Sequence, residues 1–402
     1  PYIRALRLAH AGRPVTLYEA AKHAGGRCHS FVDETLDATI DNGTHLMLSG
    51  NDEVMDYVRL AGSSDELMIQ DRARFEFLDG QSGERCAVDL GKGRGKLSLA
   101  AALMHADNRP PGVSAATLWA DMRALKNATE QTVGECLKAS TAYTVFWEPL
   151  CLGVLNAHPD VGAASVLWAA LERTVMKGGA FARPVLTRQG LGAALVEPAV
   201  ASLRAKGADV RFGARVKGLD LQGHRVAGLI FAGGAEVLGE GDQVVLAVPH
   251  FAARELIADL SVPEQSGAIL NVHFKLAHSV GEAVMIGLVN ADSHWVQARG
   301  AVASVTISAA EDWMELDGET IATRLWPDVR RALDIDGEKP AHRVVKERRA
   351  TFLATPEALG QRPGTKTAYD NLVLAGDWTQ THLPATIEGA LTSGRLAAEA
   401  LA

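Results

Sequence analysis

Asn371-Leu-Val-Leu-Ala-Gly-Asp-Trp-Thr379, followed shortly by Leu383-Pro-Ala-Thr-Ile-Glu-Gly-Ala390, is the stretch from which the fold can be inferred. Leu372 to Ala375 form a short apolar run, which predicts a buried strand. Gly376 then allows the backbone to approach a ligand closely, and the carboxylate of Asp377 can accept hydrogen bonds from sugar hydroxyls. The stretch therefore predicts a strand that ends at a ligand.

The residues after this strand predict a helix whose amino end points at the same ligand. The expected helix runs from Ala385 to Leu401, directly after Pro384, and proline is favoured at the start of a helix. A helix start presents free N–H groups and a partial positive charge, which stabilise an electron-rich ring or an anion. The alternative is an ordinary strand–loop–helix unit of an α/β protein, without a dedicated cofactor.

Composition restricts the class of protein. The 402 residues correspond to about two domains, and a content of 47% hydrophobic and 22% charged residues indicates a globular core. The net charge of −8 argues against nucleic acid as the main partner. Four separated cysteines, with no recognisable signal peptide or spanning run, indicate a reduced cytoplasmic protein and give no metal signature: Cys28, Cys86, Cys136 and Cys151.

The N-terminal region predicts part of a dinucleotide-binding fold. Pro1 to Gly12 has helical spacing, and Pro14 to Glu19 has the pattern of a strand that ends in an acid. In such folds this acid binds ribose hydroxyls about 20 residues after a glycine-rich phosphate loop. We therefore assign Glu19 to the ribose and expect the phosphate loop at or immediately before Pro1.

Two further motifs follow Glu19. Gly25 and Gly26 allow the backbone to pass close to a pyrophosphate, and the guanidinium of Arg27 is a forked donor for it. The alternative is a glycine turn with a solvated arginine. In Asp41-Asn42-Gly43-Thr44-His45, polar residues occupy a loop before an apolar segment, where His45 either faces a ring or caps a turn.

The rest of the chain predicts alternating helical and β regions. Arg74 to Leu78 alternates like an edge strand, and Gln243 to Pro249 is apolar enough for a strand buried on both faces. Strands between residues 269 and 308 are expected to form one antiparallel sheet. Further helices are expected over residues 52–61, 97–104, 132–147, 166–175, 190–203 and 320–333, and further strands over 208–220, 226–231 and 343–349.

Glu19, the Gly25 to Arg27 motif, the Asp41 to His45 motif and the C-terminal stretch together resemble the flavin amine oxidase and phytoene desaturase superfamily. Within it, the details are similar to the squalene-associated FAD-dependent desaturases, now understood as hydroxysqualene dehydroxylases of bacterial hopanoid synthesis. This finer resemblance is carried by residues 147–156, 269–274, 305–310, 346–352 and 383–390.

The resemblance implies an α/β fold with an FAD-binding Rossmann-like domain of the glutathione-reductase type and an inserted mixed α+β substrate domain. The FAD-binding domain would comprise residues 1–60, 185–260 and 341–402, and the substrate domain residues 61–184 and 261–340. Val216 would contact the adenine through its backbone. The implied FAD-binding residues are Glu19, Gly25, Gly26, Arg27, Asn42, Gly43, Thr44, Val216, Gly376, Asp377, Pro384, Ala385, Thr386 and Ile387.

The implied activity is the reductive dehydroxylation of hydroxysqualene to squalene. In it, reduced flavin delivers a hydride to an allylic carbon, and the hydroxyl group leaves as water. The leaving oxygen requires a general acid or a strong hydrogen-bond donor. The candidates are His45, beside the flavin loop, and Glu148, in an apolar stretch; Asn156 and His382 are weaker ones. For each of them, a turn cap or a buried hydrogen bond is the alternative.

The implied substrate, a C30 isoprenoid, is almost insoluble in water. We therefore expect an apolar cavity and peripheral binding to the inner face of the bacterial membrane through an exposed apolar patch. Association with upstream squalene-synthase-like enzymes is a further expectation. Oxidative carotenoid (phytoene-type) desaturation, amine oxidation and an isoprenoid-lipid carrier remain alternatives; amine oxidation is disfavoured because Trp378 is the one obvious aromatic residue of the C-terminal motif.

Overall fold

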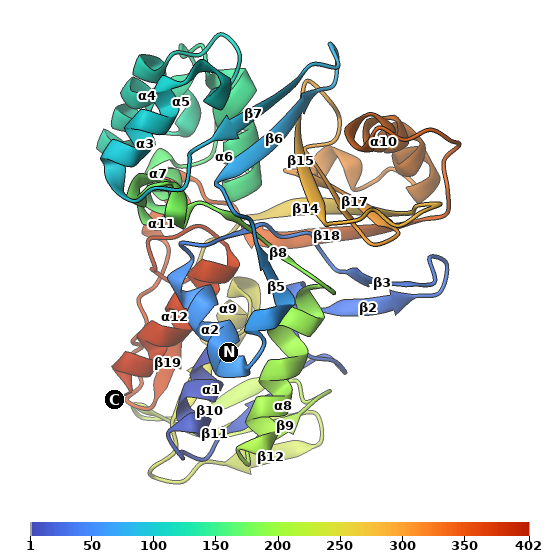
Figure 1. Ribbon diagram of the computed structural model, residues 1–402. Helices are drawn as coiled ribbons and strands as arrows, with labels where there is room; N and C mark the ends of the chain where they lie inside the picture. Colours follow the sequence, from blue (N-terminus) through green and yellow to red (C-terminus); the bar gives the residue numbers. More distant parts are fainter. Residues whose placement is uncertain (1, 402) are drawn as a thin grey trace.

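The computed structural model describes residues 2–401 and has two parts, of which the lower one in Figure 1 contains both chain ends. Four helices pack together there, and a Cβ at Gly394 would lie only 2.5 Å from Ile3 Cγ2, so glycine permits the close contact between the first and last helices. These helices are α1 (Tyr2–His10), α2 (Asp52–Ala61), α8 (Glu197–Ala205) and α12 (Ile387–Ala400).

Short parallel strand pairs connect distant parts of the chain in this lower part. β1 (Thr16–Tyr18) pairs with β9 (Asp209–Arg211), and β13 (Val244–Leu246) pairs with β19 (Leu372–Leu374). All three residues of β19 are buried, which confirms the predicted buried strand. An antiparallel sheet lies below them, formed by β10 (Gly218–Gln222), β11 (Arg225–Phe231) and β12 (Gly234–Val237).

A seven-stranded mixed sheet dominates the upper part, in the order β18-β14-β17-β16-β15-β6-β7. Alternate residues of its central strands pack on α10 (Gly318–Leu333) and form an apolar core. The opposite residues of β14, β16 and β17 are largely polar and buried. The strands are β6 (Arg74–Asp79), β7 (Arg85–Asp89), β14 (Ser266–Lys275), β15 (Val284–Val289), β16 (Trp295–Arg299), β17 (Val302–Ser308) and β18 (His342–Phe352).

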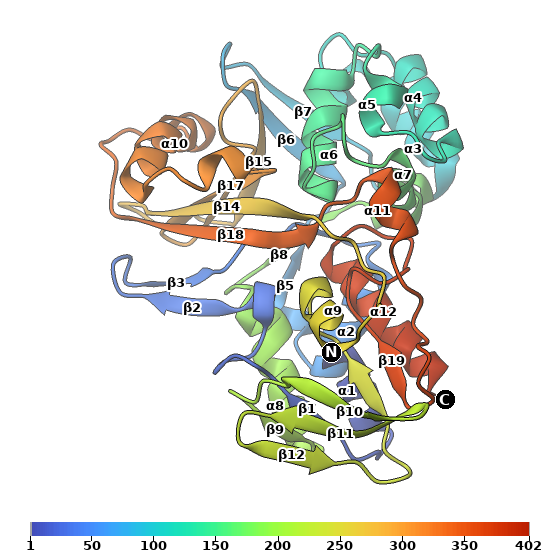
Figure 2. The same cartoon turned by 180° about the vertical axis from the view of Figure 1, so that it is seen from behind.

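A helical lobe lies beside this sheet, at the end of the molecule opposite β10–β12 (Figures 1 and 2). Its core surrounds the buried Trp147, whose indole N–H donates to Asp121 at 2.7 Å. The lobe contains α3 (Gly95–Met104), α4 (Ala115–Asn127), α5 (Val133–Leu137), α6 (Glu148–Leu155) and α7 (Ala164–Arg173). None of the helices within residues 2–401 is long and apolar enough to cross a membrane.

Short elements join the two parts. β4 and β5 flank β8 in one small sheet, and β2 pairs with β3 in a hairpin that extends beneath β18 in Figure 1. The remaining strands and α-helices are β2 (Ser30–Asp33), β3 (Ala38–Asp41), β4 (Met47–Leu48), β5 (Leu67–Ile69), β8 (Pro184–Thr187), α9 (His250–Leu256) and α11 (Pro356–Gly360).

Most predicted elements are confirmed, but four expectations were wrong. The expected helix over 132–147 is interrupted, because α5 ends at Leu137 and turns follow over residues 138–142. The strand at Arg74 lies inside the sheet, because β7 pairs along its outer side. Residues 208–220 form two strands rather than one, since the backbone turns at Gly213 (φ +67°) and each half joins a different sheet. The apolar stretch before Pro249 is buried only at Leu246, because β13 pairs on one side alone.

Candidate functional site

An ion pair joins the two ends of the polypeptide. Arg27 Nη2 lies 2.9 Å from Asp377 Oδ2, and a second guanidinium nitrogen donates to the carbonyl of Ala350 in β18. The Asp377 side chain is 7% exposed, whereas that of Arg27 is 41% exposed and retains donors toward solvent. The neighbouring carboxylate raises the pKa of Arg27, so the guanidinium stays charged. The N-terminal motif, the large sheet and the C-terminal motif therefore meet at one place.

The backbone at Gly25 requires glycine. Its φ is +103°, and a Cβ there would lie 2.9 Å from Val196 Cγ2 and 3.0 Å from the backbone of His29. Its N–H donates to the hydroxyl of Tyr2 at 3.2 Å. Gly26 also has a positive φ, +52°, but open space around it. The turn thus presents bare backbone and the Arg27 side chain at the same surface.

The backbone at Gly376 also requires glycine. Its φ is +144°, and a Cβ there would collide with the indole of Trp378. The Gly376 N–H donates to Ser393 Oγ at 2.7 Å, and Trp378 Nε1 donates to the Val248 carbonyl at 2.8 Å. These bonds hold the end of β19 against both α12 and the segment before α9.

Arg362 was missed by the sequence analysis. Only 5% exposed, it donates to the carbonyls of Asp377 at 3.0 Å and Leu383 at 2.9 Å, and also to Thr379. Its guanidinium carbon lies 4.9 Å from the centroid of the Phe352 ring. Burial lowers its pKa to about 10, which still leaves it charged at neutral pH. The turn after β19 therefore wraps around one buried cation, and no spacing in the sequence marks that arginine.

The amino end of α12 offers free donors. The helix begins at Ile387, three residues after Pro384, and Thr386 caps it by accepting from Gly389 N at 3.1 Å. The N–H groups of Ile387 and Glu388 have no acceptor within residues 2–401. Such donors, together with the helix dipole, suit an anion or an electron-rich ring.

The side chain of Glu388, in the first turn of α12, does not take part in binding at the helix start, because it is bonded to α2. Its carboxylate accepts from the N–H groups of Glu53 at 3.2 Å and Val54 at 3.1 Å, which start α2. Burial raises its pKa to about 7. The first turn of α12 therefore also anchors α2.

The predicted loop with His45 lies under the polar face of the large sheet. Thr44 N donates to Asn271 Oδ1 at 3.3 Å, and Thr306 donates to the same oxygen at 2.8 Å. A Cβ at Gly43 would lie 3.6 Å from Asn271 Nδ2. Burial, followed by the charge of Arg27, lowers the pKa of His45 to about 4, so its imidazole is neutral at pH 7. His45 therefore lies within the electrostatic reach of Arg27.

The buried carboxylate of Asp41 also holds the loop that contains His45. Asp41 accepts from Leu191 N at 2.9 Å and from Arg299 Nη1 at 3.1 Å, which ties β3 to β16. Asn42 N donates to the His29 carbonyl at 3.0 Å. The loop before His45 is thereby fixed from both parts of the molecule.

Glu19 and Val216 lie close to one another. One carboxylate oxygen of Glu19 accepts from Ala21 N at 2.8 Å, and its carbonyl accepts from Ala214 N at 2.8 Å. In the described part of the chain, neither backbone polar group of Val216 forms a hydrogen bond. A free carboxylate oxygen and free backbone groups at Val216 fit a ribose and an adenine respectively.

The other acid–base candidates, Asn156, Glu148 and His382, do not lie in the loop that contains His45. Asn156 ends α6 with φ +51°, donates to Thr351 Oγ1 at 3.0 Å and accepts from Ala309 N at 2.8 Å, so both its amide nitrogen and its amide oxygen form a hydrogen bond within the protein. Glu148 begins α6 in the helical lobe, and His382 is exposed. Neither Glu148 nor His382 forms an ion pair with Arg27 or with any other residue from 2 to 401.

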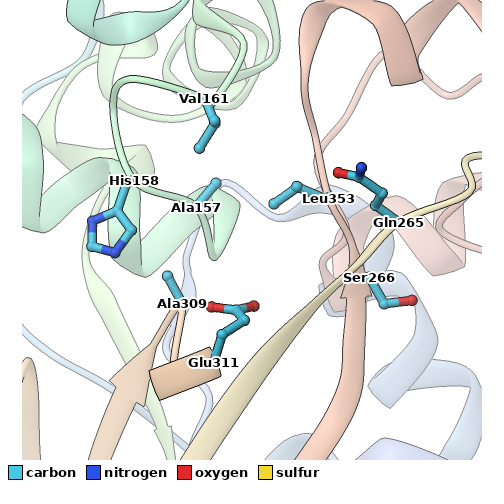
Figure 3. Close-up of a pocket in the computed structure, with 8 residues that line it drawn as sticks. All are labelled: Ala157, His158, Val161, Gln265, Ser266, Ala309, Glu311 and Leu353. Carbon is cyan, nitrogen blue, oxygen red and sulfur yellow. The ribbon is translucent and has the colours of Figure 1, made fainter. Parts of the chain in front are cut away.

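Figure 3 shows a cavity of about 390 Å³. It contains none of the residues assigned from the sequence. Ser266, on its wall, lies 3.1 Å from His250 Nε2 through its hydroxyl oxygen. The lining residues are Ala157, His158, Val161, Gln265, Ser266, Ala309, Glu311 and Leu353.

Comparison with known proteins connects this geometry to a family. The family described as flavin containing amine oxidoreductase matches residues 4–402. Hydroxysqualene dehydroxylase of Rhodopseudomonas palustris is 40% identical over 397 residues, covering 98% of this chain and 94% of that protein. The protein of the same name from Sinorhizobium fredii is also 40% identical, with the same coverage of both chains. A 15-cis-phytoene desaturase of Synechococcus elongatus is 25% identical over 60% of this chain and 58% of its own.

The fold also resembles solved structures. An oxidoreductase from Methanosarcina mazei superimposes with a TM-score of 0.69 at 14% sequence identity, covering 98% of this chain and 96% of that one. Identity at this level indicates a shared fold rather than a shared substrate.

Proposed function

The chain belongs to the family of flavin containing amine oxidoreductases, and from this premise we propose that it removes the hydroxyl group of hydroxysqualene reductively, giving squalene. It is an FAD-dependent oxidoreductase. The observation that carries the proposed substrate is the 40% identity to a hydroxysqualene dehydroxylase over 98% of the chain. The more distant phytoene desaturase match, over 60% of the chain, makes oxidative desaturation the second candidate.

We propose that residues 1–60, 185–260 and 341–402 bind FAD and that residues 61–184 and 261–340 bind the substrate. When bound, FAD supplies the hydride chemistry. The exposed donors of Arg27 and the bare backbone at Gly25 and Gly26 fit a pyrophosphate. The free carboxylate oxygen of Glu19 and the free backbone of Val216 fit the ribose and adenine.

The remaining assigned residues would border the ring. Asp377 orients Arg27 and accepts from sugar hydroxyls, while Gly376 brings the backbone close. Residues Pro384, Ala385 and Thr386 lead to the free N–H group of Ile387. Asn42, Gly43 and Thr44 form the facing loop, fixed by Asn271.

We assign to His45 the interaction with the leaving oxygen. Because its pKa is lowered to about 4, it acts at pH 7 as a neutral imidazole that donates an N–H hydrogen bond rather than as an imidazolium acid. Its place in the loop that Asn271 holds supports this assignment. Glu148 and Asn156 remain proposals with less support, since the amide of Asn156 already holds Thr351 and Ala309.

The substrate also bears on location and partners. We propose that the protein binds peripherally to the inner face of the bacterial membrane and associates with squalene-synthase-like enzymes that supply its substrate. The support is the poor aqueous solubility of a C30 isoprenoid.

The assay incubates the flavin-loaded protein anaerobically with hydroxysqualene or phytoene, with the flavin reduced or oxidised. Squalene formed only with reduced flavin is the expected result. A new double bond in phytoene would support desaturation instead, and absence of bound flavin in protein purified from cells would support a lipid carrier. His45→Gln, which retains a donor, is expected to keep more kcat than His45→Leu at unchanged flavin content.

A further inference from the structure

Helix α3 has an apolar face that the fold leaves uncovered. Leu97 is 89% exposed and Met104 is 72% exposed, although both are large apolar side chains. Together with the exposed Ala101 they follow the i, i+4, i+7 spacing of one helix face. The opposite face contributes Leu99 and Leu103, 0% and 2% exposed, to the core of the helical lobe. The helix is therefore apolar on both its inner and its outer side.

A basic glycine-rich loop precedes this face. With the first two residues of α3 it reads Gly91-Lys-Gly-Arg-Gly-Lys96, and none of Lys92, Arg94 and Lys96 forms an ion pair with a carboxylate in the described residues. Asp107 is the only acidic residue from 91 to 109. A local excess of positive charge in a chain of net charge −8 is a specific feature of this segment.

The loop is held firmly in place. Ala180 N donates to the Gly93 carbonyl at 3.0 Å, and a Cβ at Gly178 would lie 2.6 Å from that carbonyl oxygen. Arg94 also lies over the Phe181 ring, 5.4 Å from its centroid. The fixed backbone of the loop therefore keeps Lys92, Arg94 and Lys96 next to the apolar face of α3.

We propose that the loop and the outer face of α3 dock the protein on an anionic lipid surface. Leu97 and Met104 enter the boundary between headgroups and acyl chains, while Lys92, Arg94 and Lys96 bind headgroup phosphates. An anionic lipid surface has negative phosphates above an apolar layer, so it is complementary to apolar side chains that lie next to unpaired cations. A protein partner would have to supply both an apolar patch and acidic residues around it. Figures 1 and 2 show α3 on the outside of the helical lobe, away from β10–β12.

The apolar contribution is tested by sedimentation with vesicles. The flavin-loaded protein is mixed with phosphatidylcholine vesicles, with and without phosphatidylglycerol, and bound protein is measured. Leu97→Asp/Met104→Asp is expected to weaken binding at least about tenfold, since two exposed apolar side chains that would enter the membrane are replaced by charged ones. Val237→Asp is the matched control, because Val237 is 84% exposed but lies in β12, at the other end of the molecule; it is expected to bind like the unmodified protein.

The electrostatic contribution is tested by Lys92→Ser/Arg94→Ser/Lys96→Ser. Binding to phosphatidylglycerol vesicles should fall on the order of a hundredfold at low salt, and binding to pure phosphatidylcholine should change little. Lys206→Ser/Lys217→Ser, two exposed lysines elsewhere, serve as the charge control.

Three results would overturn the proposal. The first is that the unmodified protein stays in the supernatant with anionic vesicles. The second is that Val237→Asp reduces vesicle binding as much as Leu97→Asp/Met104→Asp does. The third is that the protein binds native membranes but not protein-free vesicles, which would indicate that the face of α3 binds a protein. The proposed membrane docking rests on the proposed function in one respect: a membrane-dissolved isoprenoid substrate gives the reason why the protein would bind a membrane. Because binding is read without turnover, vesicle binding in the absence of squalene formation would refute the substrate alone.

Discussion

Two buried polar regions of this protein are built in opposite ways. The backbone of residues 376–388, which we call the cofactor turn, is held by bonds that span few residues: Arg362 reaches Asp377, 15 positions away, and Ser393 reaches Gly376, 17 positions away. Its side chains also have distant partners, since Glu388 reaches Glu53, 335 positions away. The polar layer of the large sheet is held by distant partners. Thr44 and Asn271 are 227 positions apart, and Asp41 and Arg299 are 258 positions apart. The polar layer comprises Asn271, His273, Arg299, Ser304 and Thr306.

This difference in sequence separation shows that the two regions form at different stages of folding. The cofactor turn takes its shape once a loop of about twenty residues closes, at low entropic cost. The polar layer forms only when the upper and lower parts of the molecule come together. Substitutions that change the backbone of the turn, at Arg362 or Gly376, should therefore act locally, while those in the layer should act through the contact between the two parts.

The largest effect is expected for Arg362→Leu, which removes the cation at the centre of the cofactor turn. Several buried carbonyls lose their donor, so the free energy of unfolding should fall by about 3–5 kcal/mol, with loss of bound flavin. Urea denaturation followed by tryptophan fluorescence measures it. Arg324→Leu is the control, because its pair with Asp292 is 51% and 39% exposed and is worth about 1 kcal/mol or less. Equal losses in the two variants would contradict a special role for Arg362.

Gly376→Ala tests the backbone of the same turn. The φ of +144° and the adjacent indole of Trp378 leave no place for a methyl group. We expect a loss of about 2–3 kcal/mol in the free energy of unfolding, with flavin release at a lower temperature. Gly233→Ala is the matched control, since nothing lies within 4 Å of a Cβ there. A thermal shift assay that moved both variants equally would argue against strain at Gly376.

Arg27→Gln tests the link between the cofactor turn and the N-terminal motif. Loss of a charge-assisted contact should weaken FAD binding by about 1.5–3 kcal/mol, or roughly ten- to a hundredfold in Kd. Titration of the flavin-free protein with FAD, followed by flavin fluorescence, measures this change. Arg211→Gln, whose partners Asp209 and Glu236 are exposed, should leave Kd unchanged. Unaltered FAD affinity in Arg27→Gln would remove Arg27 from the proposed site.

The smallest effects are expected in the pH dependence of the free energy of unfolding, to which the two regions contribute with opposite sign. Burial lowers the pKa of His273 in the polar layer to about 4, below its ordinary value of 6.5, so the unfolded chain binds more protons between these values. The stability of the layer should therefore fall as pH drops from 6.5 to 4. Burial raises the pKa of Glu388 to about 7, above its ordinary 4.5, so the folded chain binds more protons there, and stability should fall as pH rises from 4.5 to 7.

Each group contributes a slope of at most about 1.4 kcal/mol per pH unit. Urea denaturation at a series of pH values should show that His273→Asn removes the acid-side loss and that Glu388→Gln removes the opposite slope. His278→Asn, at an exposed position, should change neither slope. Parallel curves for His273→Asn and the unmodified protein would show that His273 does not titrate as described.

Most helices and strands were predictable, whereas most of the contacts between them were not. The apolar run of β19, the glycine at 376 and the cap at Thr386 depend on neighbours only a few positions away, and such patterns are visible in sequence. Arg362 carries no comparable signal, because an arginine in a polar loop has the same local sequence whether it is solvated or buried. Periodicity likewise could not tell that β7 covers β6, since alternation marks the faces of a strand and not its neighbours.

The sequence by itself therefore determined the strand, the glycine-bounded turn and the helix of the C-terminal motif, because local sterics, capping and apolar periodicity act over a few residues. Only the tertiary structure decided that Arg27 meets Asp377, that Asn271 holds the loop before His45, and that one face of α3 stays uncovered. The physical reason is that these contacts join residues separated by long stretches of chain, and their free energy exists only after the intervening elements have packed.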